Sequence, residues 1–112
     1  MKFKDQIGKS FPFFGVDNNQ FKLGGQVWEA VENECDGYRS MLEDLVLVEE
    51  TNAIFQTYPI TTVTVKSVYR ENNFEGYEFV DFGGHVWLRV GTELWDSYYP
   101  YFVVQYTPNT GE

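Results

Sequence analysis

The stretch GYEFVDFGGHVWLRVG, residues 76–91, carries the clearest folding signal in the chain. Two runs in which apolar and polar side chains largely alternate, residues 77–82 and 85–90, flank Gly83-Gly84. Glycine adopts the positive φ angles of a tight hairpin turn without steric cost. The stretch therefore predicts an antiparallel hairpin that turns at these two glycines, with Gly76 in the turn that precedes it.

The second run of this hairpin has two different faces, because side chains alternate across a strand. One face carries three apolar side chains, Val86, Leu88 and Val90, and is expected to point to the core. The opposite face carries His85, Trp87 and Arg89. Trp and Arg cover apolar surface while their polar ends stay in water, so this face is expected to be amphipathic.

A similar frame, LGGQVWEAV, occurs at residues 23–31, which is 59 positions before residues 82–90. The two stretches share both glycines, the first Val, the Trp and the last Val. An internal duplication and two convergent solutions to one turn both explain the match. A helix competes with a strand at residues 26–34, because the apolar residues there also fit helical spacing, but the turn signal before them favours the strand.

Composition and turn signals define the fold class. The 112 residues form one domain, residues 1–112, and ten Phe, eight Tyr and three Trp favour strands. Further strands are expected at residues 13–16, 45–48, 61–69 and 101–106. The sequence predicts a mainly β single domain, with α+β as the alternative. Its expected form is a strongly twisted antiparallel sheet or partly closed barrel of about six to seven strands with one short helix.

Local signals place the helical and loop segments. The stretch SMLE, residues 40–43, has the form of a capping box and predicts one or two helical turns. The four-residue spacing of Phe3, Ile7 and Phe11 indicates a helical turn near the N-terminus, which Pro12 is expected to break. Residues 91–97 are expected to form a loop.

The chain has a net charge of −9, and its acidic side chains are concentrated in one segment. Residues 29–50 contain eight Asp or Glu and one basic residue, Arg39, whereas residues 1–28 are net positive. Such a field repels phosphates and attracts basic surfaces, which argues against direct nucleic-acid binding. The alternative is that the charge keeps a small aromatic-rich domain soluble. The sequence has no apolar run that suits a membrane span or a signal peptide, so a cytoplasmic protein without membrane contact is expected.

The sequence has no recognisable catalytic or cofactor motif. His85 is the only histidine, and Cys35 is the only cysteine. Acids on both sides of Cys35 disfavour a reactive thiolate, so a small buried hydrophobic residue is expected there. Glu32, Glu34 and Asp36 would share one face of a strand and offer oxygen ligands for Ca²⁺ or Mg²⁺, but no metal-binding motif accompanies them. We expect neither a metal nor a cofactor.

A cluster of aromatic residues occupies residues 95–102, WDSYYPYF. Rings interrupted by Asp, Ser and Pro cannot all face one core. They are expected either to be exposed as anchors of a protein interface or to close the end of the sheet. Stacking on single-stranded nucleic acid normally requires a basic groove, which the sequence does not offer.

Three short motifs carry a resemblance: ECDGYRS at residues 34–40, Gly91-Thr92, and DSYYPYF at residues 96–102. They resemble those of a family of small uncharacterised domains found mainly in bacteriophage genomes, over about residues 20–108. Some relatives have two adjacent cysteines where this chain has Cys35-Asp36, so shared cysteine chemistry is not implied. The resemblance implies a phage protein that acts in the cytoplasm of a bacterial host, and it provides no catalytic residues to transfer.

These observations favour a non-enzymatic phage-type binding protein that inhibits a host defence or nucleic-acid-handling protein, as anti-CRISPR proteins do. The expected partner is a host protein with a basic surface, and an open sheet edge is also compatible with a homodimer. The alternative is a protein that binds or sequesters a small molecule such as a nucleotide, with or without enzymatic activity. The residues predicted to contact the partner are Glu32, Glu34, Asp36, Glu43, Asp44, Trp95, Asp96, Tyr98 and Tyr99.

Overall fold

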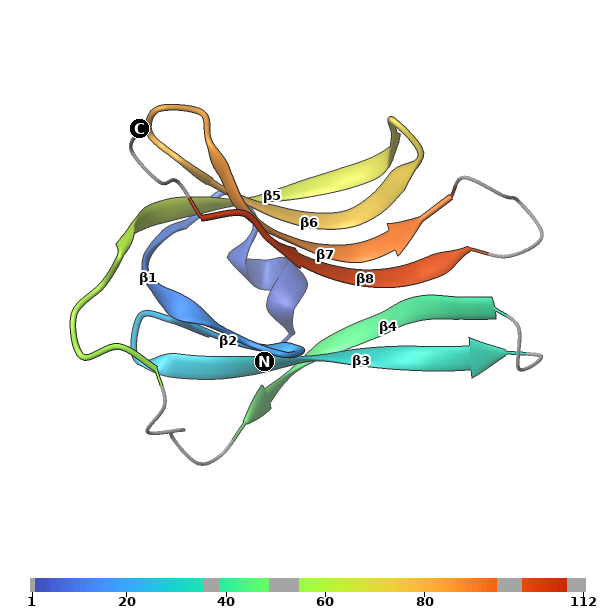
Figure 1. Cartoon of the computed structure of the whole chain (residues 1–112), viewed down its shortest axis with the longest axis horizontal. Coiled ribbons are helices and arrows are strands. Elements are labelled where there is room, and N and C mark those ends of the chain that lie inside the picture. The colour runs from blue at the N-terminus through green and yellow to red at the C-terminus, as the bar shows by residue number, and fades with distance from the viewer. Residues whose placement is uncertain (1, 36–38, 49–54, 95–99, 109–112) are drawn as a thin grey trace.

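β-branched and aromatic side chains recur along the chain, and a computed structural model shows that they build one antiparallel sheet (Figure 1). The structure describes residues 2–35, 39–48, 55–94 and 100–108, without the side chains of Glu34, Cys35 and Arg39. Within these residues the sheet has eight strands in the order β4-β3-β2-β1-β5-β6-β7-β8. The strands are β1 (Ser10–Asp17), β2 (Gln20–Leu23), β3 (Gln26–Cys35), β4 (Arg39–Val48), β5 (Thr61–Glu71), β6 (Phe74–Asp81), β7 (Val86–Glu93) and β8 (Tyr101–Tyr106).

The sheet consists of two four-stranded meanders that meet where β1 pairs with β5. The first meander, β1 to β4, forms the lower layer in Figure 1, and the second, β5 to β8, forms the upper layer. Each meander has a Gly-Gly turn between its second and third strands, as the sequence predicts. The predicted strand at 27–31 is confirmed against the competing helix, since it lies within β3.

β4 and β8 are the two edge strands of this sheet. They approach each other at one end, where the Ser40 amide donates to the Pro100 carbonyl over 3.2 Å. No ladder joins them in the described residues, so the sheet is open. The mainly β class is confirmed, whereas the strand count exceeds the predicted six to seven and the barrel alternative is wrong.

The core lies between the two layers, and one aromatic ring from outside the sheet fills its centre. This ring belongs to Phe3, which is fully buried in the 3-10 helix η1 (Phe3–Gln6). Its centroid lies 4.9 Å from the Trp28 ring of the first meander and 5.0 Å from the Tyr77 ring of the second, both edge to face. Aromatic pairs prefer this arrangement, so η1 joins the layers as well as filling space (Figure 1).

The predicted helix at residues 40–43 is wrong, because β4 passes through this stretch. β3 pairs with β4 on either side of Glu43, so ladder hydrogen bonds replace the local bonds of a capping box. Glu43 is the extra residue of a β-bulge, since Val31 pairs with Asp44 and Glu32 pairs with Leu42. The expected break at Pro12 is also wrong, because Pro12 lies within β1.

The central hairpin is confirmed, but three details of it differ from prediction. β6 ends at Asp81 and β7 begins at Val86, so the connection is a four-residue loop rather than a tight turn at two glycines. Gly76 lies inside β6, opposite Gly91, and not in the preceding turn. β7 continues to Glu93, so the expected loop at residues 91–97 is wrong for its first three residues.

Trp87 lies on the core side of β7, contrary to the predicted alternation. Leu88 pairs with Phe79 and Val86 pairs with Val80, which leaves Trp87 as the extra residue of a bulge. A bulge re-aims the side chain that it inserts. Trp87 is 7% exposed and belongs to the core, together with Leu88 and Val90 as predicted, whereas Val86 is only half-buried.

Candidate functional site

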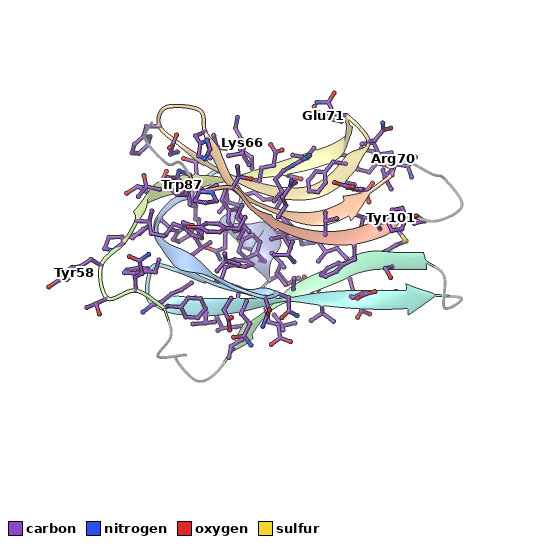
Figure 2. The ribbon with its side chains drawn as sticks, viewed as in Figure 1. Tyr58, Lys66, Arg70, Glu71, Trp87 and Tyr101 are labelled. Carbon is purple, nitrogen blue, oxygen red and sulfur yellow. The ribbon has the colours of Figure 1, made fainter. Side chains whose placement is uncertain are left out.

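A cavity of about 230 Å³ lies between β4 and the inner side of β5, β6 and β7. It occupies the end of the molecule at which the side chains of Arg70, Glu71 and Tyr101 are labelled in Figure 2. Acids, tyrosines and small hydroxyl groups dominate the polar part of its wall. The lining residues are Met41, Leu42, Glu43, Ser67, Val68, Tyr69, Glu75, Gly76, Tyr77 and Thr92.

Thr92 holds β4 against β7 beside this cavity. Its side chain is 3% exposed, and its Oγ1 accepts a hydrogen bond of 2.9 Å from the Leu42 amide. The Leu42 amide faces away from β3, so the Thr92 hydroxyl satisfies an edge donor that the ladder leaves unpaired. This contact links the two meanders and fixes the distance between the opposing walls.

The electrostatic character of the cavity is negative. Glu43 and Glu75 lie in its wall, and none of the described residues that line it is basic. Burial raises the pKa of the Tyr77 hydroxyl, and the nearby negative charge of Asp44 raises it further. Arg70 lies outside the lining and forms an exposed ion pair with Glu75, with 3.4 Å between Nε and Oε1. An exposed pair of this kind is weak, so Glu75 stays available to a cation.

A pair of glycines lets the backbones of β6 and β7 approach closely beside the cavity. Gly76, with φ 154°, lies directly against Gly91, and a Cβ atom on either residue would collide with the opposing backbone. On the outer side the Phe74 ring covers Gly91, and the Arg89 guanidinium carbon lies 4.0 Å from the centre of that ring. Arg89 Nε is also 3.0 Å from Glu78 Oε2, without hydrogen-bond geometry. Phe74 and Arg89 therefore cover the outer surface at the position where the glycines have no side chain.

Only part of the predicted contact surface can be placed. Glu32, Glu43 and Asp44 have exposed side chains on β3 and β4, and Glu43 also lines the cavity. The backbone of Glu34 lies in β3, but its side chain lies outside the described part. The remaining predicted contacts, Asp36, Trp95, Asp96, Tyr98 and Tyr99, lie outside the described residues as well.

Tyr69, Glu75 and Tyr77 also belong to this site, and none of them is among the contacts predicted from the sequence. These residues come from the second meander, and they share a cavity with Glu43 because β4 packs beside β7. The available signal was the polar and aromatic alternation of residues 75–79. This alternation predicts which side chains share a face of the strand, but it does not predict which strand of the other meander lies opposite that face.

His85 and Asp81 form a separate cluster that organises the β6–β7 loop. Asp81 Oδ1 accepts 2.9 Å hydrogen bonds from the amides of Gly83 and His85, and its Oδ2 accepts one of 2.9 Å from the Trp87 indole. His85 Nε2 lies 2.7 Å from the Thr107 carbonyl oxygen, and its ring packs edge to face on Trp87. These contacts tie the β6–β7 loop to Trp87 and to the backbone of Thr107.

The structure leaves the metal hypothesis and the cysteine prediction untested. Glu34, Cys35 and Asp36 have no described side chains. Elsewhere in the described chain, no group of three His, Cys, Asp or Glu residues is placed to hold a metal ion. Among the described residues, no helix is long and apolar enough to cross a membrane.

Comparison of the chain with known protein families, with curated proteins and with solved structures finds no match. The resemblance to small phage domains therefore stays a prediction.

Proposed function

We propose that this protein is a non-enzymatic binding module for a basic protein surface, and that the acidic cavity receives a lysine or arginine side chain of the partner. The observation that supports this most directly is that Glu43 and Glu75 line one hollow together with Tyr69 and Tyr77, and that no described residue in this lining is basic. Carboxylates pair with an ammonium or guanidinium group, and aromatic faces attract the same cations.

The charge distribution supports the same conclusion at longer range. The net charge is −9, and the exposed acids Glu32, Glu43 and Asp44 lie close together on β3 and β4. Opposite charge steers two proteins together and raises the association rate more than the final affinity. The partner we propose is a bacterial host protein that uses its basic surface for nucleic acid or defence, and occupation of that surface would inhibit it.

The test is a binding measurement with a matched control. The partner is identified by capture from bacterial lysate and purified, and its association rate is measured at low and high salt. Glu43→Gln with Glu75→Gln should lower the association rate at low salt by about tenfold and flatten the salt dependence. Asp5→Asn with Glu29→Gln removes two charges away from the cavity wall and should change the rate far less. Equal losses from both double variants would show that net charge alone, and not the cavity, governs binding.

One observation favours a second candidate function, a small-molecule site. The cavity is large enough for a small organic cation, and its acidic wall disfavours an anionic nucleotide. Native mass spectrometry of the purified protein distinguishes the two. A bound amine that disappears from Glu43→Gln would favour the small-molecule site over the protein partner.

A further inference from the structure

We propose that the free edge of β4, at residues 45–48, accepts an extended segment of the partner as an added antiparallel strand, and that this segment has apolar residues followed by a basic residue at its C-terminal end. The inference rests on the proposed binding of a basic partner, and it names the backbone contact through which that partner docks. Strand addition uses main-chain hydrogen bonds for affinity and alternate side chains for specificity.

The direction of the backbone groups of β4 follows from its neighbours. The Ala30 amide donates to the Asn19 carbonyl over 2.8 Å, so Ala30 faces β2 and not β4. Ala30 is paired with Leu45, and Trp28 is paired with Leu47. These are therefore the pairs without mutual ladder bonds, and Leu45 and Leu47 point their N–H and C=O groups to the free edge.

The edge donors of β4 are satisfied at one end of the strand and open at the other. Ser40 donates to the Pro100 carbonyl, Leu42 donates to Thr92 Oγ1, and Leu45 donates to the adjacent Asp44 Oδ1 over 2.8 Å. For the next edge donor, the Leu47 amide, no partner is found in the described chain. Figure 1 shows this half of β4 crossing β3 and running away from β8.

The side chains on this half of the strand are apolar and accessible. Val46 and Leu47 are each 42% exposed, on opposite faces of the sheet. An exposed apolar edge is the usual place for pairing with another chain. The other edge strand, β8, has the sequence YFVVQY, which contains no charge that could select a basic partner.

The charges beside the edge decide between a partner segment and a second copy of this chain. Glu43 and Asp44 precede residues 45–48, and in the sequence Glu49-Glu50 follow them. Antiparallel pairing of two copies would bring acids against acids, and like charges directly opposite destabilise a sheet. A segment with Lys or Arg at its C-terminal end would instead place that charge beside Glu43 and Asp44. A backbone carbonyl of the segment would accept the hydrogen bond from the Leu45 amide. The Asp44 carboxylate, which accepts that bond in the free protein, would then be available to the basic side chain.

The experiment uses the full chain and a labelled peptide probe that alternates Val and Thr and ends in two Lys. Fluorescence anisotropy should show binding, and a probe that ends in two Glu should bind at least about tenfold more weakly. Leu47→Pro removes the outward N–H without removing a bond to β3, and should weaken the lysine probe by about tenfold or more. Leu47→Ala keeps the N–H and is the matched control, which should bind within about threefold of wild type.

Amide hydrogen exchange of the wild-type chain gives a second readout that does not depend on how well the proline variant folds. The Leu47 amide should exchange rapidly in the free protein and become protected when the lysine probe is bound. Absence of probe binding, equal binding by the Pro and Ala variants, or an unprotected Leu47 amide would each overturn strand addition. A wild-type dimer that Leu47→Pro converts to a monomer would overturn the choice of partner.

The two proposals can fail separately. If Glu43→Gln with Glu75→Gln slows association with the purified partner while Leu47→Pro leaves that complex unchanged, the binding module stands and strand addition is wrong. If both variants bind the partner as wild type does, the proposed function is wrong as well.

Discussion

The two meanders carry the same Gly-Gly and Val-Trp frame, 59 positions apart, and they fix it by different contacts. In the first, Trp28 lies in a regular ladder opposite Phe21, and the Gly24 amide donates to the Pro12 carbonyl of β1. In the second, Trp87 lies in a bulge and donates to Asp81. The shared frame places a Trp in the core both times, but it does not determine the register around it.

The two turns differ in the residue two positions before the first glycine. Asp81 of the second meander corresponds to Lys22 of the first at the same offset. The Asp81 carboxylate accepts hydrogen bonds from two loop amides and an indole, whereas the Lys22 ammonium lies 4.7 Å from the Phe14 ring centre. The turn with the acidic side chain is therefore a four-residue loop followed by a bulge, whereas the turn with lysine at that position has two residues. The matching topology agrees with an internal duplication, which stays a hypothesis.

The largest expected effect is the loss of either tryptophan. Trp28 is 2% exposed and packs on Phe3 at the centre of the core, whereas Trp87 is 7% exposed and covers the margin near Tyr106. Trp28→Ala should lower the free energy of unfolding by about 4 kcal/mol and Trp87→Ala by about 3 kcal/mol, measured by urea denaturation. Tyr58→Ala, at an exposed position, is the control for a neutral change. An equal loss for Trp87→Ala would mean that the two halves contribute alike, and a larger loss would reverse the expected order.

The glycine pair provides the next largest effect, and it belongs to the second meander alone. A Cβ atom on Gly91 would meet the Glu75 carbonyl oxygen and lie 2.9 Å from Phe74 Cζ. Gly91→Ala should therefore lower the free energy of unfolding by about 2–3 kcal/mol. Gly25→Ala, in the first turn, has no atom within 4 Å of the new Cβ and no positive φ. If the two alanine variants unfold at the same denaturant concentration, the close approach of β6 and β7 is not as described.

The two turns can be compared through their four glycines. Gly24 has φ 58° and Gly84 has φ 91°, whereas Gly25 and Gly83 have no positive φ. Alanine at Gly24 or Gly84 should cost about 1 kcal/mol, and alanine at Gly25 or Gly83 should cost far less. Thermal melts of the four single variants measure the order. A reversed order within either pair would show that the positive φ lies on the other glycine of that turn.

Strand positions followed from the sequence where the local pattern and the pairing agree. β8 occupies residues 101–106 as predicted, because Pro100 marks its start and five of its six residues are β-branched or aromatic. The two Gly-Gly connections and the strand after each also followed, since turn chemistry is local. Residues 40–43 were misassigned because a capping box is also local, and it competes with a ladder to β3 that no local pattern reports.

The candidate site was less predictable, because its walls come from both meanders. Glu43 was selected for its charge, but its neighbours Glu75 and Tyr77 depend on how β4 crosses toward β7. Bulges added a second difficulty. The extra residues Glu43 and Trp87 interrupt the alternation of side chains, so Trp87 lies in the core beside Leu88 while Val86 is only half-buried.

The smallest expected effect is the pH dependence that Asp81 contributes, because Asp81 is only half-buried. The hydrogen bond from the Trp87 indole, followed by that from the His85 amide, holds the pKa of Asp81 below its usual value. A carboxyl whose pKa is lower in the folded state stabilises the fold above its unfolded pKa of about 3.9. That stabilisation is lost as the pH falls through the folded value. Asp81→Asn should therefore be less stable than wild type at about pH 6, and this difference should shrink below about pH 4.

Lys22→Asn changes the corresponding residue of the first turn and is the matched control for this pH series. Its stability relative to wild type should stay constant over the same acidic range, since this change neither adds nor removes a carboxyl group. Thermal melts of the three proteins at successive pH values decide the outcome. If the Asp81→Asn difference is as large below about pH 3 as at about pH 6, the carboxylate charge does not hold the loop. A neutral oxygen would then accept the hydrogen bonds from the indole and the amides equally well. The two turns would then differ in their backbone geometry and not through the charge of Asp81.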